Sequence, residues 1–126
     1  MELNQRSLDR LRGVDPILPA ILKEAIKTSP YEFQIPEDGG LRNAERQRQL
    51  YDKKVSKCDG FIKKSEHQKG TAFDIFLMID KKASWNKIAL KLVARHIQEV
   101  AKNTFNVDLV WGGDWKGFVD FPHFQL

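Results

Sequence analysis

Several features that would narrow the function of a protein are scarce or missing in this chain of 126 residues. It has a single cysteine, Cys58, which excludes an internal disulfide and a cysteine-rich zinc site. No stretch approaches the roughly 20 apolar residues that span a bilayer. The polar N-terminus, residues 1–12, lacks the apolar segment of a secretory signal. We therefore expect a chain that is made and folded in a cytoplasm, without membrane insertion, and that something else must release if it acts elsewhere.

Length and charge limit the function only broadly. The chain is 41% hydrophobic and 30% charged, which fits one ordinary domain over residues 1–126, with no separate binding module. Lys and Arg number 21 and Asp and Glu number 17, giving a formal charge of +4. This excess favours acidic partners, and nucleic acid, anionic lipid and bacterial wall polymers all fit it.

The spacing of apolar residues predicts helices early in the chain and one long helix later. A short helical lead-in is expected over residues 7–13, followed by a helix from Asp15-Pro16 to about Lys27. A further helix runs from Ala44, capped by Asn43, to about Val55. Ser84 is expected to cap the long helix, which ends near Lys102 and has an apolar side made of Trp85, Ile88, Ala89, Leu92, Val93, Ile97 and Val100.

Strands are expected between and after these helices. Residues 33–35 suggest a short edge strand, and the nearly continuous apolar run 72–79 is typical of a central strand that is covered on both faces. Residues 107–111 and 121–126 are further candidates, whereas the basic stretch 53–64 is expected to be a surface loop. Helices first and then strands around one long helix indicate an α+β fold.

One carboxylate, Asp74, interrupts the apolar run. A charged side chain inside a buried strand is costly unless it is paired or bound to a metal. His67 lies seven residues before it, and Gly70 allows the chain to turn between them. His123, near the end of the last predicted strand, is available as a third partner. Two histidines and one carboxylate with an open fourth position make a catalytic zinc site.

Several motifs surround these residues. They are the pattern S-x-H-x-x-G-x-A-x-D at Ser65, His67, Gly70, Ala72 and Asp74; Gly113-Asp114-Trp115-Lys116 with Phe118; Asp120-x-Pro122-His123-Phe124; Gly40-Leu41-Arg42 leading into Glu45, Arg46, Gln47, Leu50 and Tyr51; and the opening residues 10–16. Over nearly its whole length the chain thereby resembles the small zinc peptidases of the D-alanyl-D-alanine peptidase type. Within that family it is most similar to the phage L-alanyl-D-glutamate peptidases, which are endolysins. The resemblance implies a small antiparallel sheet packed against helices, in a hedgehog-like fold.

The resemblance also implies roles for particular residues. One zinc ion per chain is expected, with the ligands His67, Asp74 and His123. Asp120 would be the general base, which takes a proton from the attacking water and passes it to the leaving amine. Many members of the D-alanyl-D-alanine branch have Glu and Trp where this chain has Asp120 and Phe121, and this difference favours the endolysin branch.

Other residues have roles that the resemblance suggests less directly. Arg42 matches an arginine that reaches into the cleft, where a guanidinium can hold a substrate carboxylate or a developing oxyanion. Gln47 and Ser65 match family positions and are expected to bind substrate or to support the site. Trp111 and Trp115 either stack on sugar or peptide or belong to the core, and Trp115 is the one we assign to the site. His96 is in line with apolar residues of the long helix, so we expect it to pack rather than to bind metal.

These inferences lead to one expected function and several alternatives. We expect a zinc endopeptidase that cuts the L-Ala to D-Glu bond of peptidoglycan, a monomer that stays in the host cytoplasm until a holin releases it to the wall of a Gram-negative cell. A D,D- or L,D-carboxypeptidase or a dipeptidase on the same fold is the enzyme alternative. A zinc-bearing phage structural module without turnover is another, and Asp120 argues against it. A nucleic-acid binder is disfavoured because no recognition motif is found.

Overall fold

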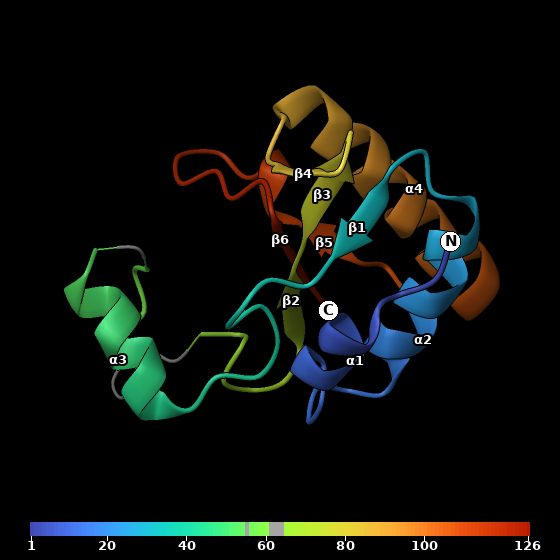
Figure 1. Ribbon diagram of the computed structural model, residues 1–126. Coiled ribbons are helices and arrows are strands. Elements are labelled where there is room, and N and C mark those ends of the chain that lie inside the picture. Colours follow the sequence, from blue (N-terminus) through green and yellow to red (C-terminus); the bar gives the residue numbers. More distant parts are fainter. Residues whose placement is uncertain (55, 61–64) are drawn as a thin grey trace.

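The computed structural model describes residues 1–54, 56–60 and 65–126, and it contains four helices and six short strands in this described part (Figure 1). The helices are α1 (Gln5–Arg10), α2 (Ile17–Ala25), α3 (Ala44–Asp52) and α4 (Lys87–Phe105), with single 3-10 turns at Ile26–Thr28 and Gly112–Asp114. The strands are β1 (Glu32–Gln34), β2 (Ala72–Asp74), β3 (Phe76–Ile79), β4 (Lys82–Ser84), β5 (Val110–Trp111) and β6 (His123–Gln125). The predicted α+β class is confirmed.

Local hydrogen bonds of Asp15 and Asn4 mark the starts of the first two helices. The Asp15 carboxylate accepts a hydrogen bond from the N–H of Ile17 at 3.0 Å, and α2 follows directly. Its last turn continues as a 3-10 turn to Thr28, close to the predicted end. The lead-in helix α1 starts two residues before the predicted position because Asn4 caps it by accepting from the N–H of Ser7.

The cap of α3 is also as predicted, and its end differs. Asn43 Oδ1 accepts from the N–H of Arg46 at 2.7 Å. The helix ends at Asp52, and the predicted end, Val55, lies outside the described residues. The predicted surface loop 53–64 is described at 53, 54 and 56–60, where it contains no helix or strand, while residues 61–64 lie outside the described part.

The apolar run 72–79 forms two strands, so the predicted single central strand is wrong. The chain leaves β2 after Asp74, passes through the buried Ile75 and enters β3. β2 is an edge of the antiparallel sheet β2-β6-β5, whereas β3 is the middle strand of the antiparallel sheet β1-β3-β4. Both strands are apolar, and periodicity therefore does not reveal the break between them. As a result, Asp74 lies at the end of a strand instead of in its middle.

A hairpin that the sequence did not reveal precedes the long helix. Ile79 pairs with Lys82, and the two residues between them, Asp80 and Lys81, both have positive φ (52° and 63°), as a tight hairpin turn requires. The turn leads into β4, which contains Ser84, so the predicted cap is wrong. Asn86 caps α4 instead, by accepting from the N–H of Ala89 at 3.0 Å.

The buried side of α4 differs in part from the predicted one. Its buried residues are Ala89, Leu90, Val93, Ala94, Ile97 and Ala101, and they pack against α2, whose buried residues are Leu18, Ile21, Leu22 and Ala25. Trp85, Ile88 and Leu92 are exposed, at 56%, 76% and 52%. α4 carries apolar residues around more than half of its circumference, so its sequence alone leaves open which side α2 covers.

The two sheets continue the core that the helices begin. Phe33 of β1, Phe73 of β2 and Phe124 of β6 are fully buried, and the last two stack with ring centroids 4.9 Å apart. The predicted strands 33–35, 107–111 and 121–126 are found as β1, β5 and β6, each shorter than or shifted from the expected range. No helix among the described residues is long and apolar enough to cross a membrane.

In contrast to this core, α3 stands to one side of the fold (Figure 1). Gln47 is the single buried residue of α3. We call residues 44–54 and 56–60 the α3 lobe. Arg46 connects the lobe to the preceding turn by two hydrogen bonds to Asp38 Oδ2, at 2.9 and 2.7 Å. The α3 lobe is therefore joined to the rest of the protein mainly through polar contacts.

Candidate active site

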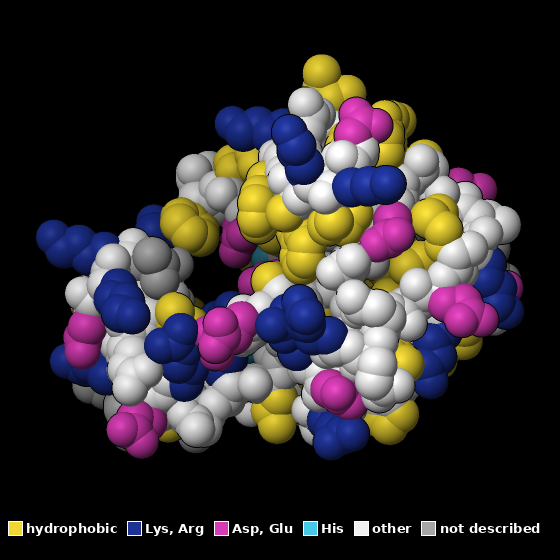
Figure 2. All heavy atoms as spheres, viewed as in Figure 1, with side chains coloured by type: hydrophobic (Ala, Val, Ile, Leu, Met, Phe, Trp, Pro, Cys, Tyr) yellow, Lys and Arg dark blue, Asp and Glu magenta, His cyan; other side chains and the backbone are white. Residues whose placement is uncertain are grey.

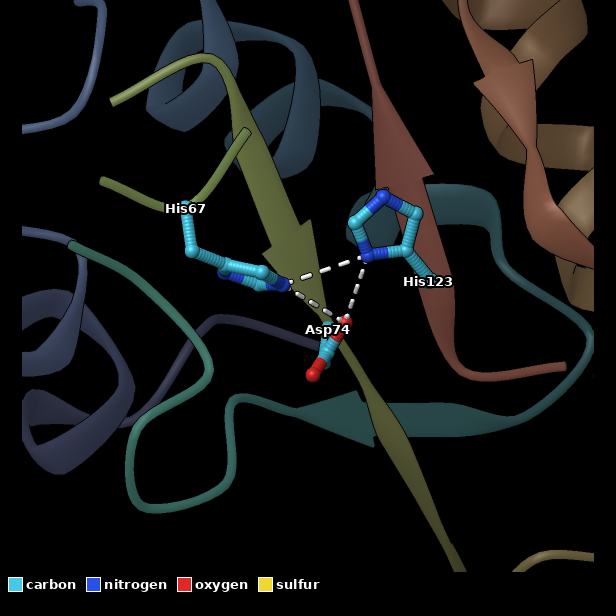
Figure 3. A group of neighbouring side chains, drawn as sticks. All are labelled: His67, Asp74 and His123. Atoms are coloured by element: carbon cyan, nitrogen blue, oxygen red, sulfur yellow. Dashed lines mark hydrogen bonds and ion pairs between the residues drawn. The ribbon is translucent and has the colours of Figure 1, made fainter. Parts of the chain in front are cut away.

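The three expected metal ligands come together at one point. His67 lies in the turn that follows Ser65, Asp74 ends β2, and His123 begins β6. Asp74 and His123 are opposite each other in the antiparallel pairing of β2 and β6. Figure 3 shows the three side chains pointing toward one another from these separate segments. The fold thus assembles the set that the sequence predicted.

Distances within this group are nearly equal. His67 Nε2, His123 Nδ1 and Asp74 Oδ1 are separated from one another by 3.2 Å in each pair. A tetrahedral zinc ion with bonds of about 2.0 Å has ligand atoms about 3.3 Å apart. The spacing of the three atoms therefore fits zinc.

The protonation of both histidines also suits a cation. His67 Nδ1 donates to the carbonyl oxygen of Gly40 at 2.9 Å, and His123 Nε2 donates to Gln125 Oε1 at 2.8 Å. These hydrogen bonds place the protons on the outer nitrogens and leave the two inner lone pairs facing each other. Two lone pairs and a carboxylate oxygen at this distance repel one another unless a proton or a metal ion lies between them.

Charges in the site perturb two of these groups. In the absence of a metal ion, burial would raise the pKa of Asp74, but the hydrogen bonds that His123 and His67 donate when a proton lies on an inner nitrogen outweigh it and hold that pKa well below its usual range. Burial would lower the pKa of His123, and the hydrogen bond to Asp74 outweighs it and raises that pKa. Asp74 is therefore ionised at neutral pH and ready to bind a cation.

Arg42 binds Asp74 through Oδ2, whereas the two histidines lie at the other carboxylate oxygen, Oδ1. Its Nη2 donates to Asp74 Oδ2 at 3.2 Å, and its Nε donates to the carbonyl oxygen of Asp38 at 2.8 Å. The remaining Nη1 donates to Gln47 Oε1 at 3.2 Å. The Arg42 side chain is only 12% exposed. The predicted position of Arg42 in the cleft is thus found, with each of its donor groups engaged.

Gln47 connects this arginine to the chain that follows α3. Besides accepting from Arg42, it donates through Nε2 to Ser56 Oγ at 2.6 Å and to the carbonyl oxygen of Cys58 at 2.8 Å. Gln47 is fully buried and does not line the cleft. Of the two roles expected for it, the structure supports positioning rather than contact with substrate.

Asp120 lies beside the group, at the end of the loop before β6. Its N–H donates to the carbonyl oxygen of Gly112 at 3.0 Å, and its own carbonyl oxygen accepts from the N–H of His123 at 3.2 Å. A side chain at Gly112 would place a Cβ only 2.4 Å from the Asp120 carbonyl oxygen, which explains the glycine there. Burial raises the pKa of Asp120, and the nearby charge of Asp74 raises it further. Such a carboxylate accepts a proton more readily than an exposed one.

Ser65 and Trp115 complete the predicted residues of the site. Both line the cleft. The Ser65 hydroxyl is buried and has no hydrogen-bond partner among the described residues. The Trp115 ring lies with its centroid 5.2 Å from that of His123. In contrast, Trp111 is buried and donates through Nε1 to the carbonyl oxygen of Phe121 at 2.7 Å, so it belongs to the core.

The hydrogen-bond partners of His96 lie outside the group formed by His67, Asp74 and His123. Its Nε2 lies 2.8 Å from the carbonyl oxygen of Ala25 and 3.2 Å from Thr28 Oγ1, so it joins α4 to the end of α2. Among the described residues, the one cluster of metal-binding side chains is His67, Asp74 and His123. The expectation that His96 packs and is not a ligand agrees with these contacts.

His67, Asp74 and His123 line an open cleft of about 470 Å³. Figure 2 shows the molecule hollowed between the α3 lobe and the rest of the fold. Its described lining residues are Arg42, Ser56, Lys57, Cys58, Ser65, Glu66, His67, Asp74, Trp115, Phe118, Asp120, His123 and Gln125. Sequence reasoning missed Gln125, although it lies two residues after His123 on the same strand face. Lys57, which the sequence placed only in a basic surface stretch, also lines the cleft, because the fold brings it there.

Comparisons with known proteins agree with this geometry. Over 123 residues the chain is 27% identical to the L-alanyl-D-glutamate peptidase of Escherichia phage T5, covering 95% of this chain and 85% of that protein. It superposes on the crystal structure of the L-Ala D-Glu endopeptidase ChiX of Serratia marcescens with a TM-score of 0.86 and 32% identity, covering 100% of this chain and 90% of that one. The model of the phage L-alanyl-D-glutamate peptidase family matches residues 1–124. The chain is therefore a peptidase and belongs to the phage L-alanyl-D-glutamate peptidase family.

Proposed function

We propose that this chain is a zinc-dependent endolysin that hydrolyses the L-Ala to D-Glu bond in the stem peptides of bacterial peptidoglycan. The observation that carries the proposal is the convergence of His67, Asp74 and His123 in a cleft that also contains Asp120 and Arg42. Its family membership and the names of its two relatives support the same bond.

The ligand set suits zinc, one ion per chain. Imidazole nitrogens and a carboxylate oxygen are ligands that zinc accepts, and three protein ligands leave a position for water or substrate. When bound there, zinc would polarise the scissile carbonyl and make the attacking water more acidic. The hydrogen bonds from His67 to Gly40 and from His123 to Gln125 orient the two rings for this role.

The other residues of the cleft supply proton transfer and charge stabilisation. The Asp120 carboxylate takes a proton from the attacking water and gives it to the leaving amine of D-Glu. The Arg42 guanidinium, held by Gln47 and Asp38, stabilises the negative charge that develops on the carbonyl oxygen. The Ser65 hydroxyl donates to the substrate backbone, and the Trp115 ring forms an apolar wall beside it.

The route to the substrate is also part of the proposal. The enzyme accumulates as a monomer in the host cytoplasm and reaches the wall when a holin opens the membrane. The family to which the chain belongs, the phage L-alanyl-D-glutamate peptidases, supports this route.

Digestion of purified Gram-negative sacculi tests the proposed reaction. We expect loss of turbidity and, by mass spectrometry, peptides with a new N-terminal D-Glu, without free reducing sugars. Chelator should stop the release, and added zinc should restore it. Release of only D-Ala or of a free dipeptide would instead identify a carboxypeptidase or dipeptidase on this fold, and no release would favour a module without turnover.

Metal analysis tests the ligand assignment separately. His67→Ala and His123→Ala should each lose zinc on dialysis, because two remaining ligands hold it too weakly. His96→Ala is the matched control and should keep one zinc ion per chain. Full zinc occupancy in either ligand variant would show that the assignment is wrong.

A further inference from the structure

One contact joins the two walls of the cleft at its mouth. Lys57 belongs to the α3 lobe and Phe118 to the loop between the second 3-10 turn and β6. The Lys57 ammonium lies 4.8 Å from the centroid of the Phe118 ring. Both side chains are exposed, and both line the cleft that contains the His-Asp-His group. A substrate that enters the cleft must pass between or displace them.

Lys57 differs from the other charged residues of the cleft in how its charge is compensated. Glu66, Asp74 and Asp120 contribute carboxylates to the lining. The guanidinium of Arg42 already donates to Asp74, Gln47 and Asp38. Among the described residues, no carboxylate forms an ion pair with Lys57. Among the described residues of the cleft lining, Lys57 is therefore a cation that is not already paired with a carboxylate.

The substrate of the proposed function brings such an anion. The nitrogen of D-Glu forms the scissile bond, and one of its two carboxyl groups continues the peptide. The other carboxylate remains free, only a few bonds from the bond that is cut. Arg42 and Lys69 already compensate two of the cleft carboxylates, Asp74 and Glu66. The Asp120 carboxylate, in contrast, has no ion-pair partner among the described residues and repels an incoming carboxylate unless a further cation compensates it.

We propose that Lys57 binds this free carboxylate of D-Glu and thereby determines the specificity of the cleft for an acidic residue after the scissile bond. A lysine on a flexible four-carbon stem reaches a carboxylate with little constraint. Its contact with Phe118 is weak at an exposed position, and a charge-assisted hydrogen bond to the carboxylate replaces it. The released Phe118 ring then packs on the bound peptide. This inference rests on the proposed function.

Two soluble peptides and three variants test it. One peptide contains L-Ala–D-Glu with the free carboxylate, and the other carries an amide in place of that carboxylate. Wild-type enzyme should cut the acid form about tenfold faster in kcat/KM, as expected for a hydrogen bond between charged groups. Lys57→Gln should lose about tenfold on the acid form and change within about twofold on the amide form. Lys57→Arg should keep most of the preference.

Lys54→Gln is the matched control. Lys54 is an exposed lysine of the same lobe that does not line the cleft, and removing its charge should leave both rates unchanged. Equal losses on both peptides for Lys57→Gln, or equal losses for Lys57→Gln and Lys54→Gln, would overturn the assignment. Equal cutting of both peptides by wild type would refute it while leaving the proposed function intact. Failure of wild type to cut either peptide would refute the proposed function and this inference together.

Discussion

The two sides of the cleft are stabilised by different kinds of contact. On one side, α2 and α4 bury ten side chains against each other and the sheets, and all of these are apolar. On the other side, α3 buries a single residue, the polar Gln47. The metal-binding atoms belong to the apolar side and to the turn beside it, whereas Lys57 belongs to the α3 lobe. This difference indicates a rigid half that carries the candidate metal site and a second half, the α3 lobe, that is held by a few hydrogen bonds.

The largest effect on turnover is expected from replacing Asp120, the proposed proton acceptor. Asp120→Ala should retain zinc and fold but lose roughly two to four orders of magnitude in turnover, because no other carboxylate takes the proton. Steady-state hydrolysis and metal content measure this. Asp108→Ala, which removes an acid that is paired with Lys102 at the surface, is the control. Activity within about tenfold of wild type in Asp120→Ala would exclude it as the general base.

Core substitutions test the contrast between the two halves directly. Ile97→Ala removes a fully buried side chain between α4 and α2 and should lower the free energy of unfolding by about 2–5 kcal/mol. Leu50→Ala in α3 removes a half-buried side chain and should cost about 1 kcal/mol or less. Chemical denaturation measures both. Equal losses would contradict the view that α3 contributes little to the apolar core.

Gln47 offers a way to weaken the α3 lobe alone. Gln47→Leu keeps the volume but removes the partners of Arg42, Ser56 and the Cys58 carbonyl group. Leaving these groups unpaired should cost about 1–3 kcal/mol of stability. Because Arg42 then loses one of its supports, we also expect kcat to fall by about tenfold. Unchanged kcat with reduced stability would show that Gln47 supports the fold but not the arginine.

The pH dependence of stability should differ with and without metal. In the metal-free protein the pKa of His123 is raised above its ordinary value of 6.5, so this group stabilises the fold below pH 6.5 and the contribution is lost as the pH rises through the folded-state pKa. Asp74, with its lowered pKa, contributes above its ordinary value of 3.8 and loses this contribution only in strong acid. Zinc binding requires neutral imidazoles and strengthens as the pH rises.

The stabilities of the metal-free and the zinc-loaded protein should therefore diverge as the pH increases. As the pH rises from about 6.5 through the raised pKa of His123, the Tm of the chelator-treated protein should fall. Over the same range the difference in Tm between zinc-loaded and metal-free protein should widen. Thermal unfolding at several pH values measures this, and a constant difference would exclude His123 as a ligand that must lose a proton.

Local signals in the sequence predicted the candidate ligand set and most of the helices. A carboxylate in an apolar run needs a partner, and Asp74 with His67 and His123 therefore pointed to a metal site before the fold was known. The Asp15-Pro16 pair and the Asn43 cap likewise predicted the starts of α2 and α3, because such signals depend only on neighbouring residues.

Features that depend on contacts between distant segments could be read from the three-dimensional structure but not from the sequence. The split of the run 72–79 at Ile75 arises because β2 and β3 pair with different strands, which periodicity does not encode. The exposed position of Ile88 and Leu92 depends on the side of α4 that α2 covers. Lys57 reaches Phe118 across a cleft formed by segments sixty-one residues apart. Its place in the site follows from the position of the α3 lobe, which no local pattern in the chain specifies.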